Sequence, residues 1–339
     1  MRNDTRKLFN NFAERVATLS GVPSAGESFS VEPSVQQTLE NHIQESSEFL
    51  GSVNIIGVDE LKGEKLGLGL TGPIAGRTNT TEKDRTPRDL SALDATGYEC
   101  RSTEFDTFVR WEKLDAWAKF RDFQARLRNM IIQQQSLDRI MIGFNGTSAA
   151  VETDRDANPL LQDVNIGWLQ QYRNNAPARV MTEGENTGEI RVGPGGDYEN
   201  IDALVYDVVN ELIDPWHRES TELRALCGRK IMADKYFPLI NKDQPPTEQR
   251  ALDMIVSQKR MGGQQAARVP YFPDGTLLIT PPENLSIYWQ RGSRRRYLKD
   301  KPERKRVENY ESSNDAYVVE DFGAGCLVEN IVFGDWSGA

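Results

Sequence analysis

Apolar residues recur every three or four positions in several stretches of the chain, which is the spacing of one face of an amphipathic helix. These stretches predict helices within residues 4–19, 33–43, 114–142, 160–176, 197–212 and 230–240. Asp4 and Asp197 are the expected N-caps of two of them, because a carboxylate accepts hydrogen bonds from free amides at a helix start. The longest stretch, 114–142, predicts a spine of about 40 Å, with one break near Asp122.

Alternating apolar positions indicate strands elsewhere in the chain. Strands are predicted within residues 51–60, 98–110, 222–228, 265–290 and 316–333. Sheets at both ends of one long helix, with a central segment that mixes helix and strand, predict an α+β protein.

Residues 61–97 follow neither pattern. Leucines alternate with glycines up to Gly72, and the segment then turns polar (RTNTTEKDRTPRD). We expect a long two-stranded excursion, which has too few apolar residues to be stable alone. Contact with another subunit would stabilise such an arm.

Length and net charge limit the number of domains and the functions that we expect. The 339 residues suggest two or three domains, and the net charge of −10 argues against a protein whose main task is to grip nucleic acid. Three widely separated cysteines are expected to be inert thiols in a reducing compartment. The chain has no apolar leader and no run of about 18 apolar residues, so we expect no signal peptide and no membrane partner.

Catalytic and cofactor motifs are weak. Residues 67–72 (GLGLTG) match G-x-G-x-x-G, but Pro73 follows at once and no βαβ unit surrounds them, so a dinucleotide site is disfavoured. The two histidines, His42 and His217, form no metal-binding pair. We therefore expect no catalytic residue, no cofactor and no metal.

One basic island interrupts this acidic chain. Residues 291–306 (RGSRRRYLKDKPERKR) hold nine lysines or arginines against Asp300 and Glu303. A solvated loop is one interpretation, and contact with nucleic acid or with an acidic neighbour is the other. An acidic body with one basic belt suits charge-complementary contact between copies of the same chain.

Short strings in a fixed order resemble the major capsid proteins of peduovirus-type (P-two-like) tailed phages. The strings cover almost the whole chain, and the ordered set is more specific than any single member. They are residues 29–35 (FSVEPSV), 44–47 (QESS), 61–65 (LKGEK), 126–129 (RLRN), 135–138 (QSLD), 143–146 (GFNG), 176–180 (APARV), 233–238 (ADKYFP), 269–273 (VPYFP), 307–311 (VENYE) and 318–321 (VVED).

The resemblance implies the Hong Kong 97-type phage capsid fold, and it divides the chain into six segments. These are an N-terminal segment removed on maturation (1–30), an N-arm (31–60), an extended loop (61–97), a peripheral domain with the spine helix (98–196), an axial domain (197–300) and C-terminal strands that return to the peripheral domain (301–339).

The same resemblance implies a function. Family members form hexamers and pentamers that close an icosahedral shell around double-stranded DNA, which they bind weakly and without specificity. Further implied partners are an internal scaffold with a maturation protease and a portal protein at one vertex. The implied location is the virion capsid, assembled in the bacterial cytoplasm.

Three groups of site residues follow from this interpretation. Proteolytic processing is expected around Ser28, Phe29, Ser30 and Val31. Intersubunit contact through the extended loop is expected to involve Gly67, Gly69, Gly72, Arg77 and Arg85. An intersubunit or DNA-facing basic patch is expected to comprise Arg294, Arg295, Arg296, Arg304, Lys305 and Arg306.

Two other functions remain open from sequence. One is a soluble enzyme that binds a nucleotide through residues 67–72. The other is a tail or baseplate protein of the same kind of virus, which would form tubes or rings instead of closed shells.

Overall fold

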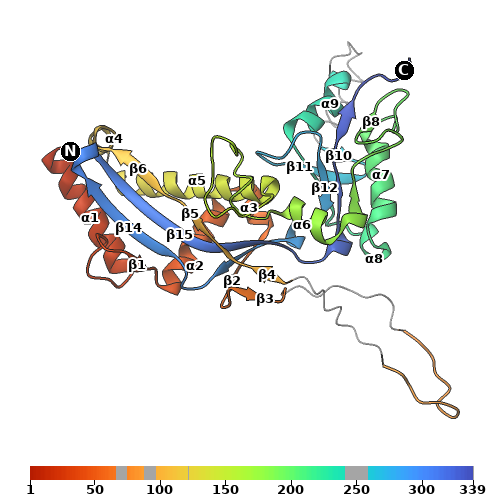
Figure 1. The fold of residues 1–339 in the computed structure, drawn as a ribbon, viewed down its shortest axis with the longest axis horizontal. Coiled ribbons are helices and arrows are strands. Elements are labelled where there is room, and N and C mark those ends of the chain that lie inside the picture. Colours follow the sequence, from red (N-terminus) through yellow and green to blue (C-terminus); the bar gives the residue numbers. More distant parts are fainter. Residues whose placement is uncertain (66–74, 88–96, 121, 241–258, 339) are drawn as a thin grey trace, which may run out of the picture.

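The computed structural model describes residues 1–65, 75–87, 97–120, 122–240 and 259–338. Two parts stand out in Figure 1: an elongated part built on a long sheet and a long helix, and a second part around another sheet, near the C-terminus. The described helices are α1 (Asn3–Leu19), α2 (Pro33–Glu45), α3 (Glu48–Ser52), α4 (Trp111–Trp117), α5 (Phe123–Asn145), α6 (Trp168–Asn175), α7 (Ile201–Leu212), α8 (Pro215–Arg218) and α9 (Arg229–Ile240), with short 3₁₀ turns at Pro177–Arg179, Pro282–Asn284, Pro302–Arg304 and Phe322–Ala324.

The predicted helices are confirmed, including the break in the spine. Asp122 stands between α4 and α5 as the N-cap of α5, and its carboxylate accepts a hydrogen bond from Arg126 one turn later. Both expected caps were wrong: α1 begins at Asn3, so Asp4 lies inside its first turn, and the side chain of Asn200, not Asp197, accepts the amide of Ala203 at the start of α7. Asp197 instead accepts the amides of Glu185 and Arg191 and so holds the preceding loop.

A seven-stranded sheet forms the elongated part. Its order is β1-β14-β15-β13-β2, and β5 and β6 also pair with β15. The strands are β1 (Phe29–Ser30), β2 (Asn54–Val58), β5 (Arg101–Glu104), β6 (Thr107–Arg110), β13 (Leu285–Gln290), β14 (Arg295–Lys301) and β15 (Arg306–Val319).

Strand β15 gives the sheet two distinct faces. Successive side chains of a strand point to opposite faces, so odd-numbered residues from Val307 to Val319 share one face and even-numbered residues share the other. The odd face meets α1, α2, α5 and α6, since Val307 packs with the α1 cluster and Tyr317 and Val319 with the α5–α6 cluster. We call this the inner face and the opposite side the outer face.

A six-stranded sheet forms the second part. Its order is β10-β11-β9-β12-β16-β7. The apolar face of α7 packs on one side of it, through Leu204 and Val208, and α6 packs on the other through Trp168. The strands are β7 (Val180–Met181), β9 (Arg224–Cys227), β10 (Arg260–Met261), β11 (Gln264–Arg268), β12 (Leu277–Thr280) and β16 (Cys326–Val328); β17 (Ile331–Phe333) pairs with β8 (Ile190–Val192), and β3 (Lys62–Gly63) pairs with β4 (Tyr98–Glu99).

Sheet membership rules out one interpretation of residues 291–306 and can be compared with the expected segment boundaries. Residues 291–306 are not a solvated loop, because most of them form β14 and its turn into β15. The expected segment boundaries also differ from the sheets: β13 and β14 belong to the seven-stranded sheet although they precede residue 301, whereas β16 joins the six-stranded sheet although it follows that residue.

Candidate functional site

The expected processing region joins α1 to the sheet. Ser28 is exposed, while Phe29 and Val31 are buried. Phe29 and Ser30 form β1 and pair with β14, and the amide of Val31 donates to the carbonyl of Arg294 at 2.9 Å. The chain is therefore accessible just before β1 and protected within it.

The segment before this region is held mainly by apolar contacts. Phe9, Phe12 and Val16 of α1 pack into a cluster with residues of α4, α5, β6, β14 and β15. Polar contacts are few: Arg6 pairs with Asp300 at 2.7 Å.

The expected loop residues are only partly described. Gly67, Gly69 and Gly72 lie outside the described residues. Arg77 and Arg85 belong to the described stretch 75–87, where both are exposed. Figure 1 shows this stretch apart from both sheets.

The expected basic patch is split by the pleat of β14. Arg295, Arg304 and Lys305 are exposed. Arg306 is half-buried and pairs with Glu308. Arg294, only 1% exposed, points to the inner face, so its assignment to a surface patch was wrong.

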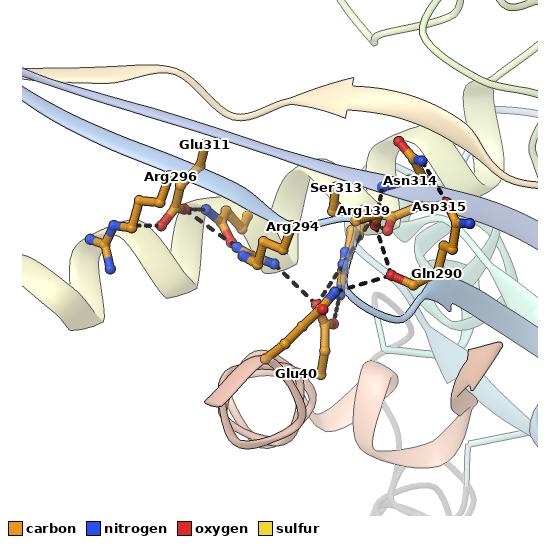
Figure 2. A network of polar contacts seen from close by, with 12 residues as sticks. Glu40, Arg139, Gln290, Arg294, Arg296, Glu311, Ser313, Asn314 and Asp315 are labelled. Carbon is orange, nitrogen blue, oxygen red and sulfur yellow. Dashed lines mark hydrogen bonds and ion pairs between the residues drawn. The ribbon is translucent and has the colours of Figure 1, made fainter. Parts of the chain in front are cut away.

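Arg296 is also turned inward. Its guanidinium nitrogen Nε lies 3.0 Å from a carboxylate oxygen of Glu311, and its side chain is 18% exposed. Two of the six expected patch residues therefore belong to an internal network, which Figure 2 shows from close by.

This network joins four elements. Its charged members are Glu40 on α2, Arg139 on α5, Arg294 just before β14, Arg296 on β14, and Glu311 and Asp315 on β15.

Glu40 is the centre of the network. Its carboxylate pairs with Arg139 through both oxygens, and it accepts a second guanidinium, from Arg294, at 3.0 Å. Arg139 also donates to Asp315 at 3.1 Å. Glu40, Arg139 and Asp315 are each at most 1% exposed, so water does not compensate these charges.

Glu311 forms the second half of the network. It accepts from Arg294 at 3.3 Å, from Arg296 and from the amide of Gln135, a residue of α5. Three arginines face three carboxylates, and the buried cluster is neutral as a whole. Burying a charge without such pairing would cost several kcal/mol.

The local charges decide the protonation states. Burial alone would raise the pKa of Glu311, but the guanidinium groups of Arg296 and Arg294 overcome it and lower that pKa. Burial alone would lower the pKa of Arg139, yet Asp315 and Glu40 raise it. For Asp315 burial dominates, and its pKa is raised despite the neighbouring Arg139.

Sequence reasoning missed this network. Arg139 lies in the long helix predicted over 114–142, and its charge gives no sign of burial. Residues 309–315 (NYESSND) are too polar to stand out as a strand. In the structure every second residue is buried, namely Asn309, Glu311, Ser313 and Asp315, but these residues are all polar and the sequence carries no apolar alternation that could have revealed the strand.

The described residues give little support for a reactive thiol or a metal site. Cys100, Cys227 and Cys326 are buried free thiols, and burial is the main cause that raises the pKa of each to about 12. Within the described ranges, no three histidine, cysteine or carboxylate side chains gather as metal ligands. No helix in the described part of the chain has the length and apolar character needed to span a membrane.

Comparison with known proteins gives concordant results. Residues 8–331 match the family model described as "Phage major capsid protein, P2 family". The "Capsid proteins" of Escherichia phage P2 are 54% identical over 346 residues, covering 99% of this chain and 97% of that protein. The "Major capsid protein" of Serratia phage KSP20 is 42% identical over 98% of both chains.

Solved structures agree with the sequence matches. A chain of the satellite phage P4 procapsid, a structure that includes the size determination (Sid) protein, superimposes with a TM-score of 0.84 and 50% identity, covering 99% of this chain and all of the other. The capsid of an empty GTA particle, at 15% identity and a TM-score of 0.51, shares the fold over 85% of this chain and 90% of that one. The fold is therefore the Hong Kong 97-type capsid fold, as the sequence predicted. The chain belongs to the P2 family of phage major capsid proteins, which are structural proteins that form icosahedral capsids.

Proposed function

We propose that the chain assembles as hexamers and pentamers, which close an icosahedral shell around double-stranded DNA. The observation that carries this proposal is the match to a procapsid chain over 99% of the present chain. The exposed stretch 75–87, which lies apart from both sheets, supports it, because a segment without a core of its own gains stability by lying on a neighbour. The same argument supports an intersubunit role for residues 61–97.

The two parts of the fold suit the two domains of such a subunit. We assign the seven-stranded sheet with α5 to the peripheral domain and the six-stranded sheet with α7 to the axial domain. Residues 31–60 are then an N-arm attached to the peripheral domain through Glu40. This assignment follows sheet membership instead of the linear boundaries.

Maturation is the second element of the proposal. A scaffold-associated protease would remove the N-terminal segment by cutting near Ser28–Val31. Because Phe29 and Ser30 pair with β14, β1 must first detach from the sheet for the protease to bind it. The buried charges of Glu40 would keep α2 in place after α1 has been removed.

The remaining partners follow from the role as a shell. We propose a portal protein at one vertex, assembly in the bacterial cytoplasm and only weak, non-specific contact with the packaged DNA. The net charge of −10 supports weak contact, since it opposes tight binding of phosphates.

The test is co-expression with the scaffold, followed by electron microscopy and sedimentation. The wild-type chain is expected to give closed spherical particles, and N-terminal sequencing is expected to find a new terminus within residues 24–31. Replacement of residues 66–86 by a short Gly/Ser linker should abolish stable shells while the subunit keeps its helical circular dichroism. Intact shells from that variant would contradict the role of the loop, and a uniformly monomeric wild-type chain would contradict the function.

A further inference from the structure

The outer face of the seven-stranded sheet carries an exposed surface opposite the charge network. Cross-strand pairing aligns Tyr297 with Tyr310, Lys299 with Glu308, and Glu308 with Phe108. Paired residues of neighbouring strands lie on the same face. We call this surface the basic-aromatic face and define it by Phe108, Arg110, Arg295, Tyr297, Lys299, Lys301, Arg306, Glu308 and Tyr310.

Aromatic rings are exposed on this face. Phe108 is 52% exposed and Tyr310 is 36% exposed. The guanidinium of Arg306 lies 4.5 Å from the centre of the Phe108 ring, and the rings of Tyr297 and Tyr310 stack with their centres 5.7 Å apart. Exposed aromatic rings beside cations are enriched at protein interfaces.

The charges of this face are only partly compensated. Glu308 accepts from the Tyr310 hydroxyl at 2.7 Å and pairs with Lys301 and Arg306. Among the described residues, Arg110, Arg295 and Lys299 make no ion pair. Five cations therefore share one carboxylate, on a chain whose net charge is −10.

A complementary segment lies elsewhere on the chain. Residues 151–156 (VETDRD) are all exposed, and they combine a fully exposed apolar side chain, Val151, with three carboxylates and one arginine. The loop is preorganised, since Asp163 accepts the amide of Asp154 at 2.7 Å and Asp154 accepts the amide of Asp156 at 2.9 Å. A preorganised loop loses little conformational entropy on binding.

Among the described residues, no hydrogen bond or ion pair joins the two surfaces within one subunit. The loop borders a cleft that α5 also lines, through Ile131 and Asp138, and α5 packs against the inner face of the sheet. The basic-aromatic face is on the opposite side. A contact between two different surfaces of identical chains is heterologous, and it generates closed rings when the rotation between copies closes.

We propose that the basic-aromatic face of one subunit binds the acidic loop 151–156 of a second copy of this chain. Val151 covers the rings of Phe108 and Tyr310, while Glu152 and Asp156 pair with cations such as Lys299. The proposal rests on the proposed function, because it supplies one contact of the assembled shell.

Charge complementarity favours this occupant over duplex DNA. The basic-aromatic face would attract phosphates as well, but the bases of a duplex are stacked on one another and do not offer their faces to Phe108 or Tyr310. An acidic loop with an exposed valine matches both the cations and the rings.

Two charge-reversal variants and their combination test the contact. Arg295→Glu/Lys299→Glu and Glu152→Lys/Asp156→Lys are each expected to lower the yield of shells at least tenfold, and the combination of all four is expected to restore most of it. The control is Arg229→Glu/Lys230→Glu, which makes the same charge change at two exposed residues of α9 and should leave the yield unchanged. Thermal unfolding of each subunit checks that the fold is intact.

A direct measurement is zero-length carbodiimide cross-linking of shells assembled from mixed ¹⁵N-labelled and unlabelled subunits. Mass spectrometry is expected to find peptides that join Lys299 or Lys301 to Glu152 or Asp156 of a differently labelled subunit. Shells without this cross-link, or without rescue by the combined variant, would overturn the inference and leave the proposed function standing. Normal empty shells with a reduced DNA content in the Arg295→Glu/Lys299→Glu variant would identify DNA as the occupant and also overturn it. A wild-type chain that forms no shells would overturn both.

Discussion

The two faces of the seven-stranded sheet use the same kinds of residue for opposite purposes. Arg294 and Arg295 are neighbours in sequence, yet Arg294 is buried between Glu40 and Glu311, whereas Arg295 is exposed and makes no ion pair among the described residues. They differ because successive residues of an extended chain point to opposite sides, and Arg294 directly precedes β14. The inner face thus holds paired charges that fix α2 to α5, whereas Arg295 on the outer face makes no ion pair among the described residues.

The difference has a simple energetic basis. A buried guanidinium depends on each of its partners, because removal of one partner leaves an uncompensated charge away from water. An exposed guanidinium is solvated in any case, so its contribution to folding is close to zero. The same residue type should therefore matter for stability on one face and for association on the other.

The largest expected effect comes from Glu40→Ala. This change removes the shared acceptor of Arg139 and Arg294, and we expect it to lower the free energy of unfolding by about 3–5 kcal/mol. Denaturant unfolding of the isolated subunit measures the loss. Glu45→Ala, at an exposed position of the same helix, is the control and should change stability by less than about 0.5 kcal/mol. Equal effects of the two changes would contradict a structural role for the network.

A matched pair of variants compares the two faces directly. Arg294→Met is expected to cost about 2–3 kcal/mol, because Glu40 and Glu311 each lose one charged hydrogen bond but keep another arginine. Arg295→Met is expected to cost less than about 0.5 kcal/mol. The measurement is again denaturant unfolding. The comparison fails if the neighbouring substitutions have the same effect.

Acid should reduce the stabilisation that the carboxylates of both faces supply, and salt should affect the two faces differently. Hydrogen bonds from Tyr310, Arg306 and Lys301 lower the pKa of Glu308 to about 2, and the pKa of Glu311 is also lowered. A carboxyl with a lowered folded pKa stabilises the protein above its unfolded pKa of about 4.3, and this stabilisation is lost as the pH falls toward the folded value. The raised pKa of Asp315 acts in the opposite sense.

Urea unfolding between pH 5 and pH 2 measures this loss. We expect both Glu308→Gln and Glu311→Gln to flatten the decline of stability with acid relative to wild type. In 1 M NaCl the effect of Glu308→Gln should shrink more than that of Glu311→Gln. Glu308 pairs with the partly exposed Lys301 and Arg306, whereas Glu311 pairs with the buried Arg294, and salt screens exposed charges more than buried ones. The same salt response in both variants would show that Glu311 is not protected from solvent.

The smallest expected effect is that of Tyr310→Phe. It removes one hydroxyl donor from Glu308 while keeping the stacked ring, so we expect only a small loss of stability, well below that of Arg294→Met. The pKa of Glu308 should rise in the variant, which a carboxyl-selective NMR titration can follow. An unchanged pKa would mean that Lys301 and Arg306 alone hold the carboxylate ionised.

Much of the fold could be predicted from the sequence, because helices and apolar strands show local patterns of apolar residues. The period of apolar residues predicted α1, α2, α5 and α7, and the break at Asp122 was predicted as well. The resemblance of ordered strings predicted the family, and the comparisons confirm it. The candidate site was harder: of the six basic residues expected on a surface, Arg294 is inside, and the carboxylates that pair with it were not recognised.

By itself, the sequence determined the positions of most helices and strands, the acidic balance and the family, since each depends on residues close together in the chain or on their order. Only the tertiary structure decided which charges are buried. Glu40 and Arg139 are 99 residues apart in the chain, and Arg139 and Glu311 are 172 residues apart. No local pattern predicts an ion pair that forms only when α2, α5 and β15 pack together. The physical reason is that a polar residue shows no preference for the interior until a partner of opposite charge is placed beside it.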